Sequence, residues 1–287
     1  MKKLWIVILI GILCSFSADK PAYKIFDKEG VVTSYQQLLN ASLKSDIVLF
    51  GELHNNPIIH WLQLELTKDL HTQLGQKLIL GAEMFEADDQ LILNEYLNGR
   101  IKDSQLDAEA KLWPNYNTDY KPLLDFAKEN KLNFIATNIP RRYAAMVSKS
   151  GFEVLDSLNT EARNYFMPLP VAYDAELPCY KTMLKMGGGP MGHKNLNLPK
   201  AQAVKDATMA YFILKNYQKG NVFLHYNGTY HSENYEGIVW YLKKANPKLK
   251  ILTIASVEQT QLDSLEAGSK SIADFVLITP ESMTKTH

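Results

Sequence analysis

Short apolar segments that recur between helix-like segments constrain the fold of this chain more than any other feature. Each is bounded by polar or turn residues and lacks strict alternation, as expected for strands buried on both faces. These segments are 46–50, 77–85, 132–138, 221–226, 250–256 and 274–279. Helices are predicted between them at 57–74, 120–131, 198–218 and 235–246, the first with Pro57 in its first turn and Asn55 or Asn56 as its cap. The alternation predicts an α/β fold with a mostly parallel sheet flanked by helices.

The alternation stops between Pro140 and Pro199. This stretch offers no convincing strand and is rich in aromatic residues, prolines and methionines, with a glycine-rich segment at 186–195. We expect a smaller helical cap, residues 141–198, inserted after the third core strand. The α/β core domain would then comprise 19–140 and 199–287, after a leader at 1–18.

The leader has the features of an export signal. Lys2 and Lys3 precede an apolar run at 4–13, which is too short for a confident membrane span. Three outcomes are open: lipidation of Cys14 as the first mature residue, cleavage after Ser17, or an uncleaved anchor. Large residues just before Cys14 depart from the usual lipidation motif. We expect an exported protein, either a membrane-anchored lipoprotein of the bacterial envelope or a periplasmic or secreted one.

Charge and cysteine content narrow the classes of partner. The 31 basic and 31 acidic residues balance, so nothing favours nucleic acid as a partner. The chain has two cysteines, Cys14 and Cys179, and loss or lipidation of the first leaves no intrachain disulfide.

Polar residues gather where the predicted strands end. In open α/β sheets, sites form in the crevice outside the carboxyl ends of the strands. Four successive strand ends deliver Glu52 and His54, then Glu83, then Arg141 and Arg142, and finally His225 and His231. This convergence predicts a functional site at one edge of the sheet.

Each of these residues also has a structural interpretation. Glu52 and His54 point the same way in extended backbone, which suits a ligand pair, an acid with its orienting partner, or a solvated strand end. Glu83 in a buried strand is costly unless paired or coordinated. His231 follows Gly228 in a loop that favours the cleft, whereas His225 and His60 fit satisfied structural histidines.

The arginine pair and Asp206 each have both a functional and a surface interpretation. Arg141 and Arg142 follow Pro140 at a helix start, where an anion would meet guanidinium and backbone N–H groups. One of the two arginines is expected only to form a surface ion pair. Asp206 interrupts an apolar helix, either as a partner for a histidine or as a solvated residue.

No familiar catalytic motif is present, because the chain lacks HExxH, Gly-x-Ser-x-Gly, a P-loop and a Rossmann glycine fingerprint. The strand-end residues nevertheless predict two chemistries. His54, Glu83 and His231 are candidate ligands for zinc or a similar divalent metal. The same residues with Glu52 are candidates for general acid–base catalysis.

Several segments together resemble the ChaN family of haem-binding, iron-regulated lipoproteins. They are "VLFGELHNNPIIHWLQLEL", "LGAEMFEADDQ", "NIPRR", "AQAVKDATMA" and "GTYHSENYEGIVWYL". The resemblance runs from about residue 22 to 279, and it places the chain in a wider haem-uptake and Tiki superfamily with relatives of erythromycin esterase and Tiki-type proteases.

The resemblance implies a parallel α/β domain with a smaller helical domain, a lipid anchor, and a homodimer around haem with tyrosine ligation. The cap offers four candidate tyrosines, and the resemblance does not choose among Tyr143, Tyr165, Tyr173 and Tyr180. His193 is a further candidate contact, and Arg141 or Arg142 would meet the propionates. We therefore expect a haem-binding protein of haem or iron acquisition, with a metal-dependent peptide or ester hydrolase as the alternative.

Overall fold

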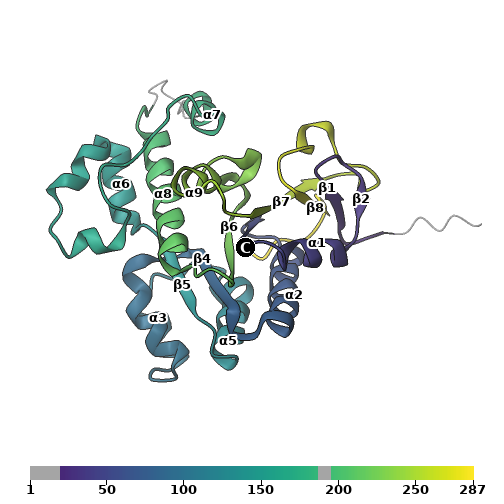
Figure 1. Cartoon of the computed structure of the whole chain (residues 1–287), viewed down its shortest axis with the longest axis horizontal. Helices are drawn as coiled ribbons and strands as arrows, with labels where there is room; N and C mark the ends of the chain where they lie inside the picture. The colour runs from purple at the N-terminus through teal and green to yellow at the C-terminus, as the bar shows by residue number, and fades with distance from the viewer. Residues whose placement is uncertain (1–19, 187–194) are drawn as a thin grey trace, which may run out of the picture.

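A sheet of eight strands forms the centre of the molecule, with helices on both of its faces (Figure 1). The computed structural model describes residues 20–186 and 195–287. Its strands are β1 (Lys24–Asp27), β2 (Val32–Thr33), β3 (Ile47–Glu52), β4 (Leu78–Glu86), β5 (Phe134–Asn138), β6 (Val222–Gly228), β7 (Ile251–Gln259) and β8 (Phe275–Pro280).

The sheet is parallel except at one edge. Its order is β2-β1-β8-β7-β3-β6-β4-β5, and the pairs from β8 to β5 are parallel. β1 pairs antiparallel with both β8 and β2. All six strands that the sequence predicts are confirmed, and β1 and β2 are additions that the α/β rhythm did not indicate.

The α-helices of the described residues are α1 (Tyr35–Ser42), α2 (Pro57–Leu74), α3 (Gln90–Leu97), α4 (Asp103–Glu109), α5 (Lys121–Glu129), α6 (Arg141–Ser150), α7 (Pro178–Met186), α8 (Leu198–Asn216) and α9 (Ile238–Ala245). The start of α2 resolves one open choice in the sequence. The Asn56 side chain accepts a hydrogen bond from the Ile59 N–H at 3.2 Å, and Pro57 occupies the first turn. Asn56 is therefore the cap.

Burial on both faces explains why the central strands are continuously apolar. In β3, Val48 and Phe50 belong to one hydrophobic cluster, while Ile47 and Leu49 belong to the other. The first cluster contains residues of α2 and α5, and the second contains residues of α6, α8 and α9.

The described residues between β5 and α8 form helices joined by loops. It contains α6, two 3-10 helices at Phe152–Ser157 and Ala162–Tyr165, and α7. A helical insertion after the third predicted strand is thus confirmed, while the domain boundaries at 141 and 198 stay a prediction. Within residues 20–186 and 195–287, every helix falls short of the length or the apolar character that a membrane span requires.

Candidate functional site

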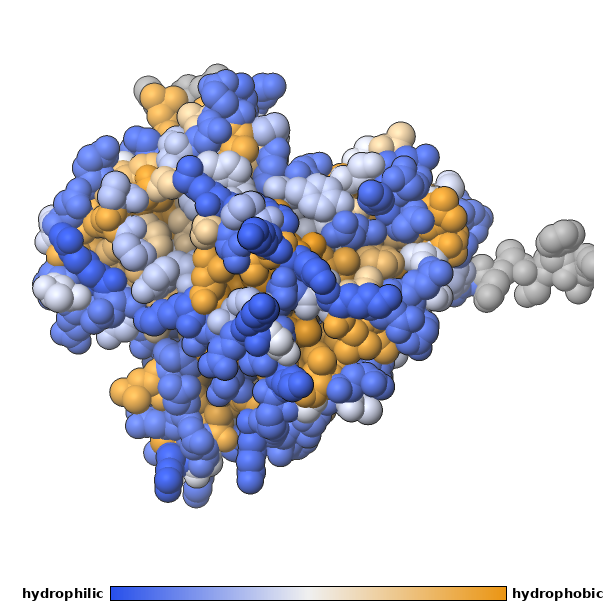
Figure 2. Space-filling model, viewed as in Figure 1, coloured by the Kyte–Doolittle hydropathy of each residue, from blue (hydrophilic) through white to orange (hydrophobic). Residues whose placement is uncertain are grey.

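A cleft of about 1140 Å³ opens at the carboxyl ends of β3, β4, β6 and β7. Apolar side chains and charged ones share its wall. The apolar group includes Leu112, Trp113, Pro114 and Ile139, and the arginine and lysine side chains are Arg141 and Lys205. On the face drawn in Figure 2, hydrophobic and hydrophilic side chains also adjoin near the centre of the molecule.

His231 lies between two buried carboxylates in this cleft. Its Nδ1 is 2.5 Å from Asp206 Oδ1 on α8, and its Nε2 is 3.1 Å from Glu83 Oε1 on β4. Burial lowers the pKa of His231, but the charges of Glu83 and Asp206 outweigh it and raise that pKa to about 10. His231 is therefore an imidazolium at neutral pH. Of the two interpretations of Asp206, partner of a histidine or solvated residue, the first is correct, and the histidine is His231.

Glu83 is held on its other oxygen as well. Burial raises the pKa of Glu83, but the charge and hydrogen bond of His231 reverse this and hold that pKa well below its usual range. The Gly228 N–H donates to Glu83 Oε2 at 2.8 Å. A register shift between β4 and β5, between Ala82 and Glu86, accompanies the placement of Glu83 in the cleft.

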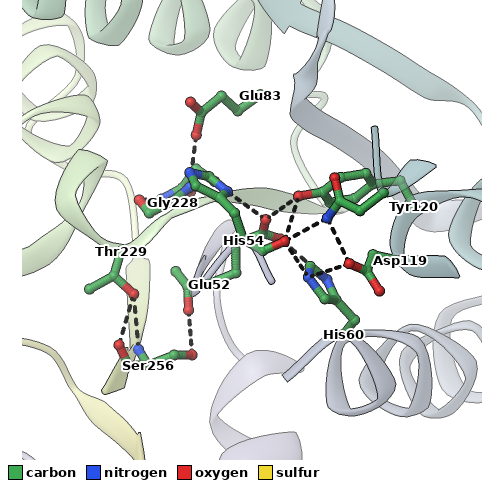
Figure 3. Close-up of polar contacts among 12 residues, drawn as sticks. Glu52, His54, His60, Glu83, Asp119, Tyr120, Gly228, Thr229 and Ser256 are labelled. Atoms are coloured by element: carbon green, nitrogen blue, oxygen red, sulfur yellow. Dashed lines mark hydrogen bonds and ion pairs between the residues drawn. The ribbon is translucent and has the colours of Figure 1, made fainter. Parts of the chain in front are cut away.

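Glu52 and His54 form the second pair (Figure 3). The two side chains turn to the same side of the strand end, and His54 Nδ1 is 2.9 Å from Glu52 Oε1. Burial raises the pKa of Glu52, but the hydrogen bond of His54 and the adjacent histidines lower it overall. Burial lowers the pKa of His54, and the hydrogen bond and charge of Glu52 raise it overall.

Buried donors fix the Glu52 carboxylate in place. The Tyr120 hydroxyl donates to Oε1 at 2.8 Å, and the Gln63 amide donates to Oε2 at 2.7 Å. His60 extends this cluster, because its ring lies 3.7 Å from Glu52 Oε2 and 3.5 Å from Asp119 Oδ2 (Figure 3). His60 is thus a buried supporting residue behind the cleft. The side chain of His54 is 40% exposed and faces the cleft.

The arrangement favours acid–base groups over metal ligands. Across residues 20–186 and 195–287, no group of three or more His, Cys, Asp or Glu side chains is arranged to hold a metal ion. His54, Glu83 and His231 do meet in the cleft, but both nitrogens of His231 already contact carboxylates. A metal ligand needs a neutral imidazole with one free nitrogen.

His225, also at this strand end, is buried away from the cleft. Its Nε2 lies 2.7 Å from the Thr137 hydroxyl and its Nδ1 lies 3.1 Å from Asn227 Oδ1. Burial lowers its pKa to about 4. His225 is therefore neutral and structural.

The two arginines at the start of α6 have different surroundings. Arg141 lines the cleft, and its Nε donates to Glu86 Oε1 at 2.6 Å. Arg142 faces away from the cleft and donates to Asp88 Oδ2 at 2.5 Å and to the Tyr143 hydroxyl at 3.2 Å.

A second, smaller cavity of about 630 Å³ lies on the cap side of α6. Two of the four candidate tyrosines, Tyr143 and Tyr165, line it together with Arg142. The other two lie elsewhere. Tyr180 is fully buried with its hydroxyl 3.0 Å from Asp206 Oδ2, and Tyr173 packs against Tyr180 with ring centroids 5.4 Å apart.

Some candidate residues fall outside the described part of the chain. Cys14 lies within residues 1–19, and His193 lies within residues 187–194. Other residues of the site were not anticipated from the sequence: Trp113, Tyr120, Gln202, Lys205, Tyr230 and His287. Of these, Gln202, Lys205 and Tyr230 lie inside segments that carry the family resemblance, in which Asp206 and His231 were the candidate residues.

The sequence matches the family described as Haem-binding uptake, Tiki superfamily, ChaN over residues 38–242. A solved structure described as cofacial heme binding to ChaN of Campylobacter jejuni superposes with a TM-score of 0.68 at 19% identity. That superposition covers 90% of this chain and 96% of the other. It shows that the two share a fold.

Protein RETICULATA-RELATED 5, chloroplastic, of Arabidopsis thaliana is 24% identical over 260 residues, which is 84% of this chain. The chain spans about a third of that relative, 34% of its length.

Proposed function

This chain belongs to the haem-binding uptake family ChaN of the Tiki superfamily, and from that premise we propose that it binds haem at the cavity lined by Tyr143 and Tyr165. The proposal rests on one observation: two phenols and the guanidinium of Arg142 meet at a single cavity. Its volume of about 630 Å³ lies within the range of roughly 300–1,000 Å³ for small-molecule sites.

The chemistry of these residues fits haem. The phenol oxygen of Tyr143 or Tyr165 would hold the haem iron, and haem would supply that iron as the acceptor of the oxygen. Arg142 can pair with a propionate, because a guanidinium matches a planar carboxylate. Leu158 and Ala162 add apolar surface to the cavity, and the rest of its wall is polar, with Asp88, Ser157, Asn159 and Glu161. Tyr143 is held by packing against Phe166, with ring centroids 5.8 Å apart, and this fixes its ring.

A haemin titration followed in the Soret region tests this proposal. We expect saturable binding with a high-spin ferric spectrum, and a loss of affinity of at least about tenfold in Tyr143→Phe or Tyr165→Phe. Tyr173→Phe is the matched control, because it removes a cap hydroxyl outside the cavity. Unchanged affinity and spectrum in both cavity variants would refute the assignment.

We also propose that the protein is exported, is anchored in the envelope through Cys14, acts in haem or iron acquisition, and binds haem as a homodimer. The leader, with Lys2, Lys3 and the apolar run at 4–13, supports export and anchoring. Cell fractionation of Cys14→Ser against the unchanged chain tests the anchor, since only the variant should become soluble. Sedimentation with and without haemin tests the dimer.

A second candidate function, hydrolysis of a peptide or ester, is favoured by the Glu52–His54 pair. With Nδ1 of His54 on Glu52, its Nε2 has no hydrogen-bond partner among the described residues. This nitrogen can take a proton from water as the water oxygen attacks a carbonyl carbon, and can return it to the leaving group. Arg141 and Lys205 line the same cleft and are the cations available to the oxyanion.

Release of p-nitrophenol from p-nitrophenyl acetate and of dye from labelled casein measures this activity. We expect His54→Asn to abolish turnover while Tyr143→Phe leaves it unchanged. Equal rates in the chain and in His54→Asn would remove hydrolysis as a candidate.

A further inference from the structure

The last residues of the chain fold back from the edge of the sheet to its centre. β8 lies near one edge of the sheet, yet the C-terminus lies close to β6 and the start of α2 (Figure 1). Residues 285–287 reach the loop after β3, the end of β7 and the π-helix Tyr116–Tyr120. His287 lines the large cleft together with His54 and His231.

Four contacts hold this segment against the cleft wall. The Thr286 N–H donates to the Asn55 carbonyl at 3.1 Å, and the Thr286 hydroxyl donates to Asp119 Oδ2 at 2.7 Å. The Lys285 ammonium pairs with the Glu258 carboxylate. The Asn55 amide also lies 3.5 Å from the His287 carbonyl oxygen. The cleft wall therefore recognises a main-chain N–H, a hydroxyl and a cation.

The two carboxylates that receive these contacts also accept hydrogen bonds from other side chains of the fold. Asp119 is buried, and its Oδ2 also accepts from Asn115 at 2.6 Å. Glu258 accepts from the buried Asn56 at 2.9 Å. Both acceptors are thus positioned independently of the segment that they bind, which is a property of a prepared site.

We propose that this wall of the cleft is a binding site for an extended peptide that carries a basic residue followed by a hydroxyl residue, and that residues 285–287 occupy it in cis. The site has acceptors that point at the peptide, and two of them are the carboxylates of Glu258 and Asp119, which contact Lys285 and Thr286. A cationic peptide is therefore favoured over an acidic one. A ligand that extends beyond the position of His287 enters the cleft that His54 and His231 line.

The tether makes the cis segment a competitor for any peptide in trans. A short tether keeps the local concentration of a segment on the order of millimolar, so a free peptide binds well only when the segment is absent or weakened. This inference does not depend on haem binding, because Tyr143 and Tyr165 line a different cavity.

Fluorescence anisotropy of a labelled peptide with the sequence of residues 281–287 tests the proposal. We expect saturable binding to a chain that ends at residue 280, and binding at least about tenfold weaker to the full chain. Because truncation can disturb folding, the full chain with Lys285→Ala and Thr286→Ala is the second host, and it should bind more tightly than the unchanged chain.

Acceptor variants and a scrambled peptide provide the controls. The acceptor variants are made in the host with Lys285→Ala and Thr286→Ala. There, Asp119→Asn and Glu258→Gln should each lower the affinity for the peptide. Asp263→Asn, which changes an exposed acid elsewhere, should leave the affinity unchanged. The proposal is overturned if the scrambled peptide binds as well as the natural one, or if neither host binds the natural peptide.

Discussion

The Asp206 carboxylate lies 2.5 Å from His231 Nδ1, and the opposite nitrogen of the same ring lies 3.1 Å from Glu83. A neutral imidazole has one N–H and one acceptor nitrogen, so it can donate to only one of these two carboxylates. The doubly held ring is therefore a cation, and it joins α8, β4 and the turn after β6.

The first prediction concerns alkaline pH. Burial lowers the pKa of His231, yet Glu83 and Asp206 raise it from 6.5 to about 10. A raised pKa in the folded state means that the stabilisation is fully present below about pH 6.5 and is lost as the pH rises through about 10. Urea unfolding between pH 6 and pH 10.5 should show a falling free energy of unfolding that is much flatter in His231→Gln. A slope that persists unchanged in the variant would contradict the assignment.

The second prediction concerns the Asp206 carboxylate itself. Asp206→Asn leaves His231 with one partner and should cost about 3 kcal/mol, the low end of the range for a broken buried pair, because Glu83 remains. Tyr180→Phe removes only the hydroxyl that contacts Asp206 at 3.0 Å, and should cost about 1–2 kcal/mol. Urea unfolding of the two variants and of the double variant measures the coupling. Strict additivity would mean that Tyr180 and Asp206 act independently.

The sequence predicts those elements of the fold whose pattern is contained in a continuous run of residues. The six strands of the parallel part of the sheet are predictable because they are largely buried and hence mostly apolar. The sequence does not predict β1 and β2, because Lys24–Asp27 is short and Val32–Thr33 has only two residues, too few for a periodic pattern. They also pair antiparallel at the edge, outside the repeating β–α units.

The residues of the candidate site also fall into two groups, those that the sequence predicts and those that only the structure identifies. Glu52, His54, Glu83 and His231 are predictable, because they directly follow or end parallel strands that share one edge. Trp113 and His287 come from segments without such a rule, and only the tertiary structure brings them to the cleft. The choice of Tyr143 and Tyr165 over Tyr180 likewise needs the structure, because all three lie in helix-forming sequence and only packing separates a cavity wall from the core.

The third prediction concerns the close approach of Gly228 to His54. A Cβ at position 228 would lie 2.9 Å from Cε1 and Nε2 of His54. Because φ there is −57°, alanine meets no backbone strain, and the ring must move instead. Gly228→Ala should cost about 1–3 kcal/mol and shift the His54 resonances in NMR spectra. Gly268→Ala, where a Cβ meets nothing within 4 Å, is the control. Unperturbed His54 resonances in Gly228→Ala would contradict the packing.

The last prediction concerns mild acid, where a different histidine acts with the opposite sign. Burial lowers the pKa of His225 from 6.5 to about 4, against the weaker opposing effect of Asn227. Unfolding releases this ring to water, so between these two pH values the unfolded chain binds a proton that the folded chain does not. His225 therefore contributes stability above about pH 6.5, and this is lost as the pH falls toward about 4. The urea midpoint should fall across this window, and His225→Gln should flatten the dependence although it lowers the midpoint at pH 7. Glu52 and Glu83, whose pKa values are lowered on folding, add a slope of the same sign below about pH 5. The contribution of His225 is therefore measured between about pH 6.5 and 5. If the variant retained the full acid dependence, another group would be the source of it.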